Sequence, residues 1–233
     1  MDDTLERTHV VTDPAILYFG TPVVLLSTVN PDGRPNLAPI SSVYWLGHQA
    51  MLGINRNSQT WANLARTAEV AVALPSADQV DAVNRLALTT GRDPVSERQQ
   101  RRGYRHVADK FGVSGLTPVP ADLIAPPLVA DCPVVMECTV DAMADGETAD
   151  GRPRIPAVEV TVRRVHASPD VLVPGRPNRI DPDRWHPLIM SFQHFYGLAD
   201  GKLVPSRLAT VDEELYRSPV PAGDSGGAGA STG

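Results

Sequence analysis

The sequence of 233 residues is poor in cysteine and has no long apolar run. Its two cysteines, Cys132 and Cys138, are too few for a disulfide scaffold or, alone, for a cysteine-rich zinc site. No segment approaches the roughly 20 apolar residues that a membrane helix needs. The acidic, polar N-terminus MDDTLERTHV does not resemble a signal peptide. We therefore expect a cytoplasmic protein with no membrane partner.

A net positive charge and several catalytic motifs are also missing. The formal net charge is −6, which argues against a nucleic-acid partner because such proteins normally carry a basic surface. The only glycine-rich run follows no predicted strand, so it is not a dinucleotide-binding fingerprint. Neither a Walker A motif, nor HExxH, nor a Gly-x-Ser-x-Gly elbow occurs, and the six histidines are scattered.

Turn-forming residues are abundant, with 18 glycines and 22 prolines. They separate short segments rich in β-branched residues, which predict strands over 22–29, 36–45, 51–54, 70–74, 134–140 and 157–165. Pro39 indicates an edge strand or a bulge. One helix is predicted after the cap residue Ser58, and a short helical turn over 13–18. Short strands without βαβ alternation predict a mainly β protein, a barrel, with helical insertions.

The chain divides into three parts by composition. Residues 1–12 form a loose lead-in, and residues 13–215 form one domain with a helical insertion at about 77–115. Within the insertion, the charged segment 96–112 is predicted to be helical. Residues 168–187 hold five prolines and are predicted to be mostly loop. Residues 216–233 are predicted to be a disordered tail, because the stretch 221–233 has only small and polar residues besides proline.

A candidate anion site lies between a predicted strand and the predicted helix, at residues 55–60. The first turn of a helix has free N–H groups and a dipole that favours an anion. Ser58 and Thr60 add hydroxyl groups, and Arg56 adds a guanidinium. The alternative is that Ser58 only caps the helix while Arg56 is solvated.

Three further groups have polar or aromatic character. Ser41, Ser42 and Val43 lie in a predicted strand, where a bulge would leave backbone donors free for a planar polar ligand; the alternative is an edge strand with serines facing water. A basic run can meet dinucleotide phosphates or be a solvated helix face; it comprises Arg98, Arg101, Arg102, Arg105, His106 and Lys110. His194, Phe195 and Tyr196 can stack on a flat ligand or pack in a core or subunit interface.

The order of these segments resembles the flavin reductase-like, FMN-binding split-barrel family. The resemblance runs from about Phe19 to Ala209. It is carried by TPVVLLSTVNPDGRPNLAPISSVYW, NSQTWANL before EVAVALPS, KFGVSGLTPVP, CPVVMEC and HFYGL. It implies a six-stranded split barrel that forms a homodimer, with FMN near the dimer interface.

The resemblance also implies roles for individual residues. Arg56, Ser58 and Thr60 would hold the FMN phosphate, and Asn63 would support that loop. Ser41, Ser42 and Val43 would approach the isoalloxazine ring, largely through backbone groups. Phe111 falls where a segment can cover the flavin, and His194 and Tyr196 would reach a flavin, across the interface if the chain is a dimer.

The resulting hypothesis is an NAD(P)H-dependent flavin reductase, in which hydride passes from NADH or NADPH to FMN and the cofactors supply the chemistry. Reduced flavin would go to a partner monooxygenase, or stay bound and reduce another acceptor. A second hypothesis is an FMN-binding electron-transfer or flavin-carrier protein that does not oxidise nicotinamide. A third keeps the barrel but replaces FMN with another flavin-like cofactor or haem.

Overall fold

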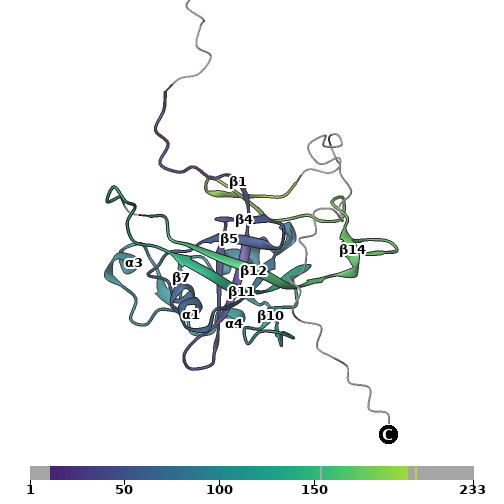
Figure 1. Ribbon diagram of the computed structural model, residues 1–233, viewed down its shortest axis with the longest axis horizontal. Coiled ribbons are helices and arrows are strands. Elements are labelled where there is room, and N and C mark those ends of the chain that lie inside the picture. Colours follow the sequence, from purple (N-terminus) through teal and green to yellow (C-terminus); the bar gives the residue numbers. More distant parts are fainter. Residues whose placement is uncertain (1–10, 153, 199–202, 204–233) are drawn as a thin grey trace, which may run out of the picture.

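The fold is organised around one curled sheet with seven strands in the order β3-β2-β6-β11-β12-β5-β4 (Figure 1). The computed structural model describes residues 11–152, 154–198 and 203. Every neighbouring pair in this sheet is antiparallel. The chain is therefore a mainly β split barrel, as the sequence predicts. It has seven strands, one more than the predicted six, because the predicted strand 36–45 is two separate strands.

The elements of the sheet and the helices follow the turn-forming residues closely. The seven strands are β2 (Val24–Val29), β3 (Pro35–Ile40), β4 (Val43–Leu46), β5 (Gln49–Gly53), β6 (Glu69–Leu74), β11 (Val134–Ala144) and β12 (Ala157–Ala167). The helices are α1 (Gln59–Thr67), α2 (Val80–Arg85), α3 (Glu97–Arg101) and α4 (Lys110–Ser114), with 3-10 turns at Ala77–Gln79 and Pro169–Val171.

Short strand pairs surround the sheet. A three-stranded sheet joins β1 (Phe19–Pro22), β15 (Ile189–Ser191) and β16 (His194–Tyr196). The two-stranded pairs are β7 (Thr89–Thr90) with β8 (Arg105–His106), β9 (Pro118–Val119) with β10 (Leu128–Val129), and β13 (Leu172–Val173) with β14 (Arg176–Ile180). Among the described residues, no helix has the length and apolar character needed to cross a membrane.

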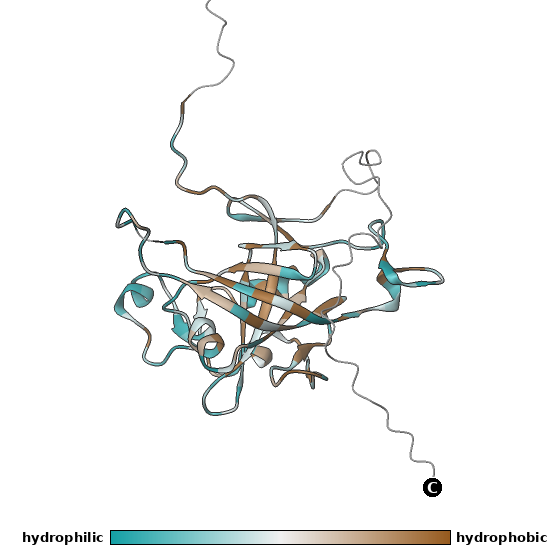
Figure 2. Cartoon of the chain, viewed as in Figure 1, coloured by the Kyte–Doolittle hydropathy of each residue, from teal (hydrophilic) through white to brown (hydrophobic). Residues whose placement is uncertain are grey.

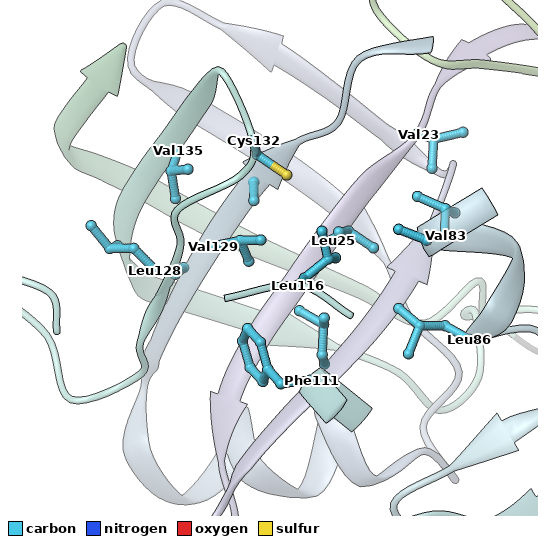
Figure 3. Packing of buried hydrophobic residues seen from close by; sticks show 14 of the residues in the cluster. Val23, Leu25, Val83, Leu86, Phe111, Leu116, Leu128, Val129, Cys132 and Val135 are labelled. Carbon is cyan, nitrogen blue, oxygen red and sulfur yellow. The ribbon is translucent and has the colours of Figure 1, made fainter. Parts of the chain in front are cut away.

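Both faces of β2 and β6 are buried, which explains their nearly continuous apolar sequences. Val24 and Leu26 point into an inner core inside the curled sheet, together with Leu64 of α1. Leu25 and Ala73 point to the other side, into an outer core that is closed by the segments between β6 and β11 (Figure 3). Figure 2 shows apolar residues along the strands of the sheet and polar residues in α3.

Residues 116–131, which we call the strap, cover the outer core and are held by carboxylates. Leu123 N donates to Glu137 Oε2 at 2.6 Å, and Ala125 N donates to Glu69 Oε2 at 2.9 Å. Glu137 is fully buried, and its Oε1 lies 2.7 Å from His166 Nε2. This proline-rich segment has few backbone partners of its own, so side chains of the sheet satisfy its N–H groups.

Three local predictions are wrong. Residues 13–18 form no helical turn, because one turn without a packed apolar face does not repay the cost of helix nucleation. The segment 96–112 is not one helix: Gly103 has φ +84°, and β8 follows it before α4 begins. Residues 168–187 are less irregular than predicted, since they contain β13 and β14. The predicted tail 216–233 and most of the lead-in 1–12 lie outside the described residues.

Candidate flavin-binding site

The first turn of α1 exposes unused hydrogen-bond donors. Ser58 caps the helix, since its Oγ accepts from Trp61 N at 3.1 Å, as predicted. Ser58 N itself donates to Asn55 O. The N–H groups of Gln59 and Thr60 find no acceptor within the described residues. Two free amides and the proton of a serine hydroxyl therefore remain at the positive end of the helix dipole.

A buried polar network fixes this helix on the sheet. Asn63 is fully buried, and its Nδ2 donates to Thr28 Oγ1 at 3.0 Å and to Asn30 Oδ1 at 2.9 Å. Asn36 Nδ2 donates to the hydroxyl oxygens of both Thr28 and Thr60 at 3.2 Å. Thr60 is only 3% exposed, so its hydroxyl belongs to this network beneath the loop. Thr60, which the resemblance assigns to the phosphate, and Asn63, which it assigns to support of the loop, thus both hold the helix from below.

Arg56 is exposed and makes no hydrogen bond or ion pair with any described residue. It lines a pocket of about 540 Å³ that the connection between β11 and β12 completes. The loop is therefore open on the side where Arg56 lies. A guanidinium without a carboxylate partner at such an opening is available to an anionic ligand.

The predicted ring-binding segment is the crossing between the two edges of the sheet. Ser41 and Ser42 link β3 at one edge to β4 at the other, and we call this dipeptide the seam. Ser42 O accepts from Gly53 N at 2.7 Å, and Gly53 lies three residues before Arg56. The ring-binding candidates and the phosphate-binding candidates are thus adjacent in space. Val43 is buried in the inner core, so only its backbone is available to a ligand.

Phe111 and Lys110 lie apart from these groups. Phe111 is 3% exposed and packs in the outer core, so its side chain has no open face toward a ligand (Figure 3). Lys110 is 4% exposed at the start of α4, and burial lowers its pKa to about 8. Lys110 therefore does not belong to a solvated basic face, whereas Arg98, Arg101, Arg102, Arg105 and His106 are exposed.

His194 and Tyr196 lie exposed on β16, in the small three-stranded sheet. That sheet reaches the seam through its first strand: Tyr18 precedes β1, and its hydroxyl lies 3.4 Å from Ser42 Oγ. Phe19 and Phe192 stack edge to face there, with ring centroids 5.1 Å apart. An aromatic surface therefore borders the seam on the side away from the inner core.

Arg92 and Gly91 belong to the site region, although the sequence does not single them out. Arg92 Nε donates to Asn57 O at 3.1 Å, so the insertion braces the anion loop. A Cβ at Gly91 would lie 2.7 Å from Asn36 Oδ1 and 3.0 Å from Gln59 Cγ, so only glycine allows this approach. A lone Arg within a charged insertion gives no sequence signal that distinguishes it from solvated neighbours.

The donor set fits the phosphate of a flavin mononucleotide. It offers two free amides, the Ser58 hydroxyl and the unpaired Arg56 at a helix N-terminus, which together match a doubly charged group. Asn36 Oδ1 is buried beneath the same loop without a hydrogen-bond partner among the described residues, but as an acceptor it is not part of this donor set. The free amides and the guanidinium are the features that a structural cap alone does not require.

Comparison with known proteins matches most of this chain. A family model described as "Flavin reductase like domain" matches residues 16–198. The uncharacterized protein YdfE of Bacillus subtilis (strain 168) is 31% identical over 185 residues, which cover 79% of this chain and 87% of that protein.

Two solved structures share the fold at low sequence identity. Flavoredoxin of Desulfovibrio vulgaris (Miyazaki F) superimposes with a TM-score of 0.68 at 16% identity, covering 87% of this chain and 98% of that chain. Nitrilotriacetate monooxygenase component B from Bacillus cereus gives a TM-score of 0.63 at 18% identity, covering 80% and 88%. At these identities the likeness establishes the arrangement of the barrel alone.

Proposed function

The chain belongs to the flavin reductase-like family, and from this premise we propose that it is an NAD(P)H-dependent flavin reductase. The proposal rests above all on one observation: the amides of Gln59 and Thr60 and the guanidinium of Arg56, which have no partner among residues 11–152, 154–198 and 203, lie beside the seam. A flavin needs a phosphate site and a nearby surface for its ring. This junction offers both within a few residues.

The protein's part in this reaction is to bind and orient. The nicotinamide supplies a hydride and the flavin accepts it, so no acid–base residue of the chain is required. Arg56, Ser58 and the first-turn amides neutralise the phosphate of the FMN moiety. Backbone groups at Ser41, Ser42 and Val43 would bind the ring. Asn63 and Thr60 keep α1 in register with β2 and β3, which fixes the distance between the two halves of the site.

We propose that two chains associate through the aromatic surface beside the seam. The exposed side chains on and beside β1, β4 and β16 include Tyr18, Phe19, Tyr44, Leu46 and Tyr196, and exposed apolar side chains of this kind are typical of an interaction surface. In such a homodimer, His194 and Tyr196 of one subunit lie close to the flavin of the other. The structural similarity to component B of a monooxygenase supports a further proposal, that reduced flavin is passed to a separate monooxygenase.

The test is a pair of measurements on purified protein. We expect FMN to bind, and NADH or NADPH absorbance to fall only when FMN is present. Binding without nicotinamide oxidation would indicate a flavin carrier, and absence of flavin binding would overturn the proposal.

A matched pair of cap variants tests the site. Ser58 and Ser96 both cap helices, through Trp61 N and Gln99 N respectively. We expect Ser58→Ala to weaken FMN binding by roughly 1–3 kcal/mol, because it removes a hydrogen bond to a charged group. Ser96→Ala removes an equivalent cap from α3 and should leave FMN affinity unchanged. Equal effects of the two variants would remove Ser58 from the site.

A further inference from the structure

The register between β5 and β12 brings two arginines to one opening. The last pair of this ladder is Gly53 opposite Ala157, and Ile54 N then donates to Pro156 O at 3.3 Å. Arg56 lies three residues after Gly53, and Arg154 lies three residues before Ala157, on the two segments that leave this ladder. Had the ladder continued, the two guanidinium side chains would stand opposite each other, an arrangement that like charges make unfavourable.

The segment after β5 and the segment before β12 separate at this point, and a pocket of about 540 Å³ lies between them. Arg56 and Arg154 both line it, with Gly146, Glu147 and Pro156. Arg154 Nε donates to Glu147 O at 2.9 Å, and neither arginine forms an ion pair with any described residue. Two positive charges therefore face one hollow against the single carboxylate of Glu147. An anion between the arginines would relieve their repulsion.

The connection that carries Arg154 is held in place by its own hydrogen bonds. Thr148 N donates to Arg152 O at 2.7 Å, and Arg154 N donates to Gly146 O at 2.8 Å. Arg152 is paired with Asp150 at 2.7 Å, so its charge is already compensated. The connection leaves the ends of β11 and β12 on the side of α3 (Figure 1). Arg154 is thus the cation of this connection that remains available.

A second hollow shares Arg154 with the first. Its volume is about 440 Å³, and it is lined by Arg154 together with Ala144, Thr148, Arg152 and Ile155. Ile155 is 83% exposed, an apolar side chain with no packing role within the described chain. The two hollows are far larger than one phosphate group requires. They combine cationic groups with an apolar surface suited to a planar base.

We propose that the two hollows bind the adenylate (AMP) half of a dinucleotide, with its phosphate between Arg56 and Arg154 and its adenine against Ile155. The inference rests on the proposed function, because the FMN moiety at α1 supplies the neighbouring half of the ligand. FAD and NADH both carry this chemical group. The site therefore makes the chain select a dinucleotide where the loop at α1 alone would accept FMN.

The experiment measures dissociation constants of FMN, FAD and ADP, and the KM for NADH, for the wild-type protein and for Arg154→Gln. We expect the substitution to weaken FAD and ADP binding by about tenfold, as for one lost charged hydrogen bond, and to leave FMN affinity within about twofold. Arg176→Gln on β14 removes an equal charge from a residue that lines neither hollow, and it should change none of the three dissociation constants. Arg56→Gln should weaken FMN and FAD together.

The possible outcomes distinguish FAD from NADH as the dinucleotide that binds in the hollow. A selective loss of FAD affinity assigns the hollow to the flavin dinucleotide, and a raised KM for NADH with unchanged FAD affinity assigns it to the nicotinamide donor. Equal loss for FMN and FAD would place both arginines on the first phosphate and overturn the inference. The inference would also be overturned if the affinities for FAD and ADP and the KM for NADH were all unchanged. If the wild-type protein binds no flavin, the proposed function fails, and ADP binding still reports on the hollow itself.

Discussion

Gly53 ends β5 at a point where the backbone of the seam leaves no room for a side chain. A Cβ at this position would lie 2.7 Å from Ser42 Cβ. We expect Gly53→Ala to push the seam outward and to cost about 1–3 kcal/mol of unfolding free energy, as overpacked sites do. Urea denaturation measures the loss. Adding Ser42→Gly removes the opposing Cβ and should restore most of the stability; a failure to restore it would show that the collision lies elsewhere.

Lys110 is a buried amine with no hydrogen bond or ion pair from its side chain to any described residue. Its pKa is lowered by burial from 10.5 to about 8, so the unfolded chain binds this proton more tightly than the folded one. Stability therefore decreases as pH falls from about 10.5 to about 8 and stays reduced below that. We expect Lys110→Met to raise the unfolding free energy at pH 7 by about 3 kcal/mol, the equivalent of this shift.

The measurement for Lys110 is urea denaturation at pH 7 and at high pH. The advantage of Lys110→Met should shrink toward high pH, where the wild-type lysine is neutral in both states. Arg105→Met, at an exposed position of the same basic run, should change stability by less than about 0.5 kcal/mol. An equal gain from both substitutions would contradict the role of burial.

Residue-level prediction from sequence succeeds where the cause is local. Ser58 is a helix cap because a serine before an amphipathic run satisfies its own first turn, and that is visible in the sequence. The burial of Thr60, Lys110 and Phe111 depends on segments far away in the chain, so the sequence does not reveal it. Whether a polar residue faces ligand or core is decided by tertiary packing.

At the scale of elements, the strap depends on one carboxylate. Burial alone would raise the pKa of Glu137, but hydrogen bonds from His166, Leu123 and Asp122 hold it below its ordinary value of 4.5. Its contribution to stability is therefore complete above that ordinary value and is lost as pH falls through the lower folded value. Asp122 and its partner Arg164, 2.6 Å apart, are the other charged groups beside this pair.

We expect Glu137→Gln to lower the unfolding free energy at pH 7 by roughly 2–3 kcal/mol, because a buried acceptor of several N–H groups loses its charge. The variant should also show a flatter stability profile in the acidic range, measured by urea midpoints between neutral pH and pH 3. Glu97→Gln, on the exposed helix α3, serves as the control and should keep the wild-type profile. A Glu137 variant with the full acid slope would contradict this account.

Element boundaries show where sequence patterns are informative. Strands β2, β6, β11 and β12 and the helix α1 appear in the sequence as β-branched or amphipathic runs, and the structure contains them. The break at Ser41 and Ser42 is not visible locally, because the two flanking strands join different neighbours, β2 and β5, at opposite edges of the sheet. The insertion is misjudged because a left-handed Gly103 and the pairing of β7 with β8 override helix propensity.

At the scale of the whole molecule, the aromatic surface beside the seam predicts association. Leu46 is 80% exposed on the edge strand β4. We expect Leu46→Glu to shift a dimer toward monomer, because a charge would be buried at the interface. Sedimentation velocity over a range of concentrations measures the shift. Leu88→Glu, at an exposed leucine of the insertion, should leave the association unchanged; a wild-type protein that stays monomeric would refute the proposed dimer.

The seam also has a consequence for the order in which this chain matures on the ribosome. The hairpin of β4 and β5 finds its only other sheet neighbour in residues 157–161, more than a hundred positions further on. Contacts between residues so far apart in the sequence form late, because the entropy cost of closing the loop between them must be met first. A nascent polypeptide lacking its last third thus has helix α1 but not β12, so the pocket beside α1 cannot be complete until β12 has been synthesised.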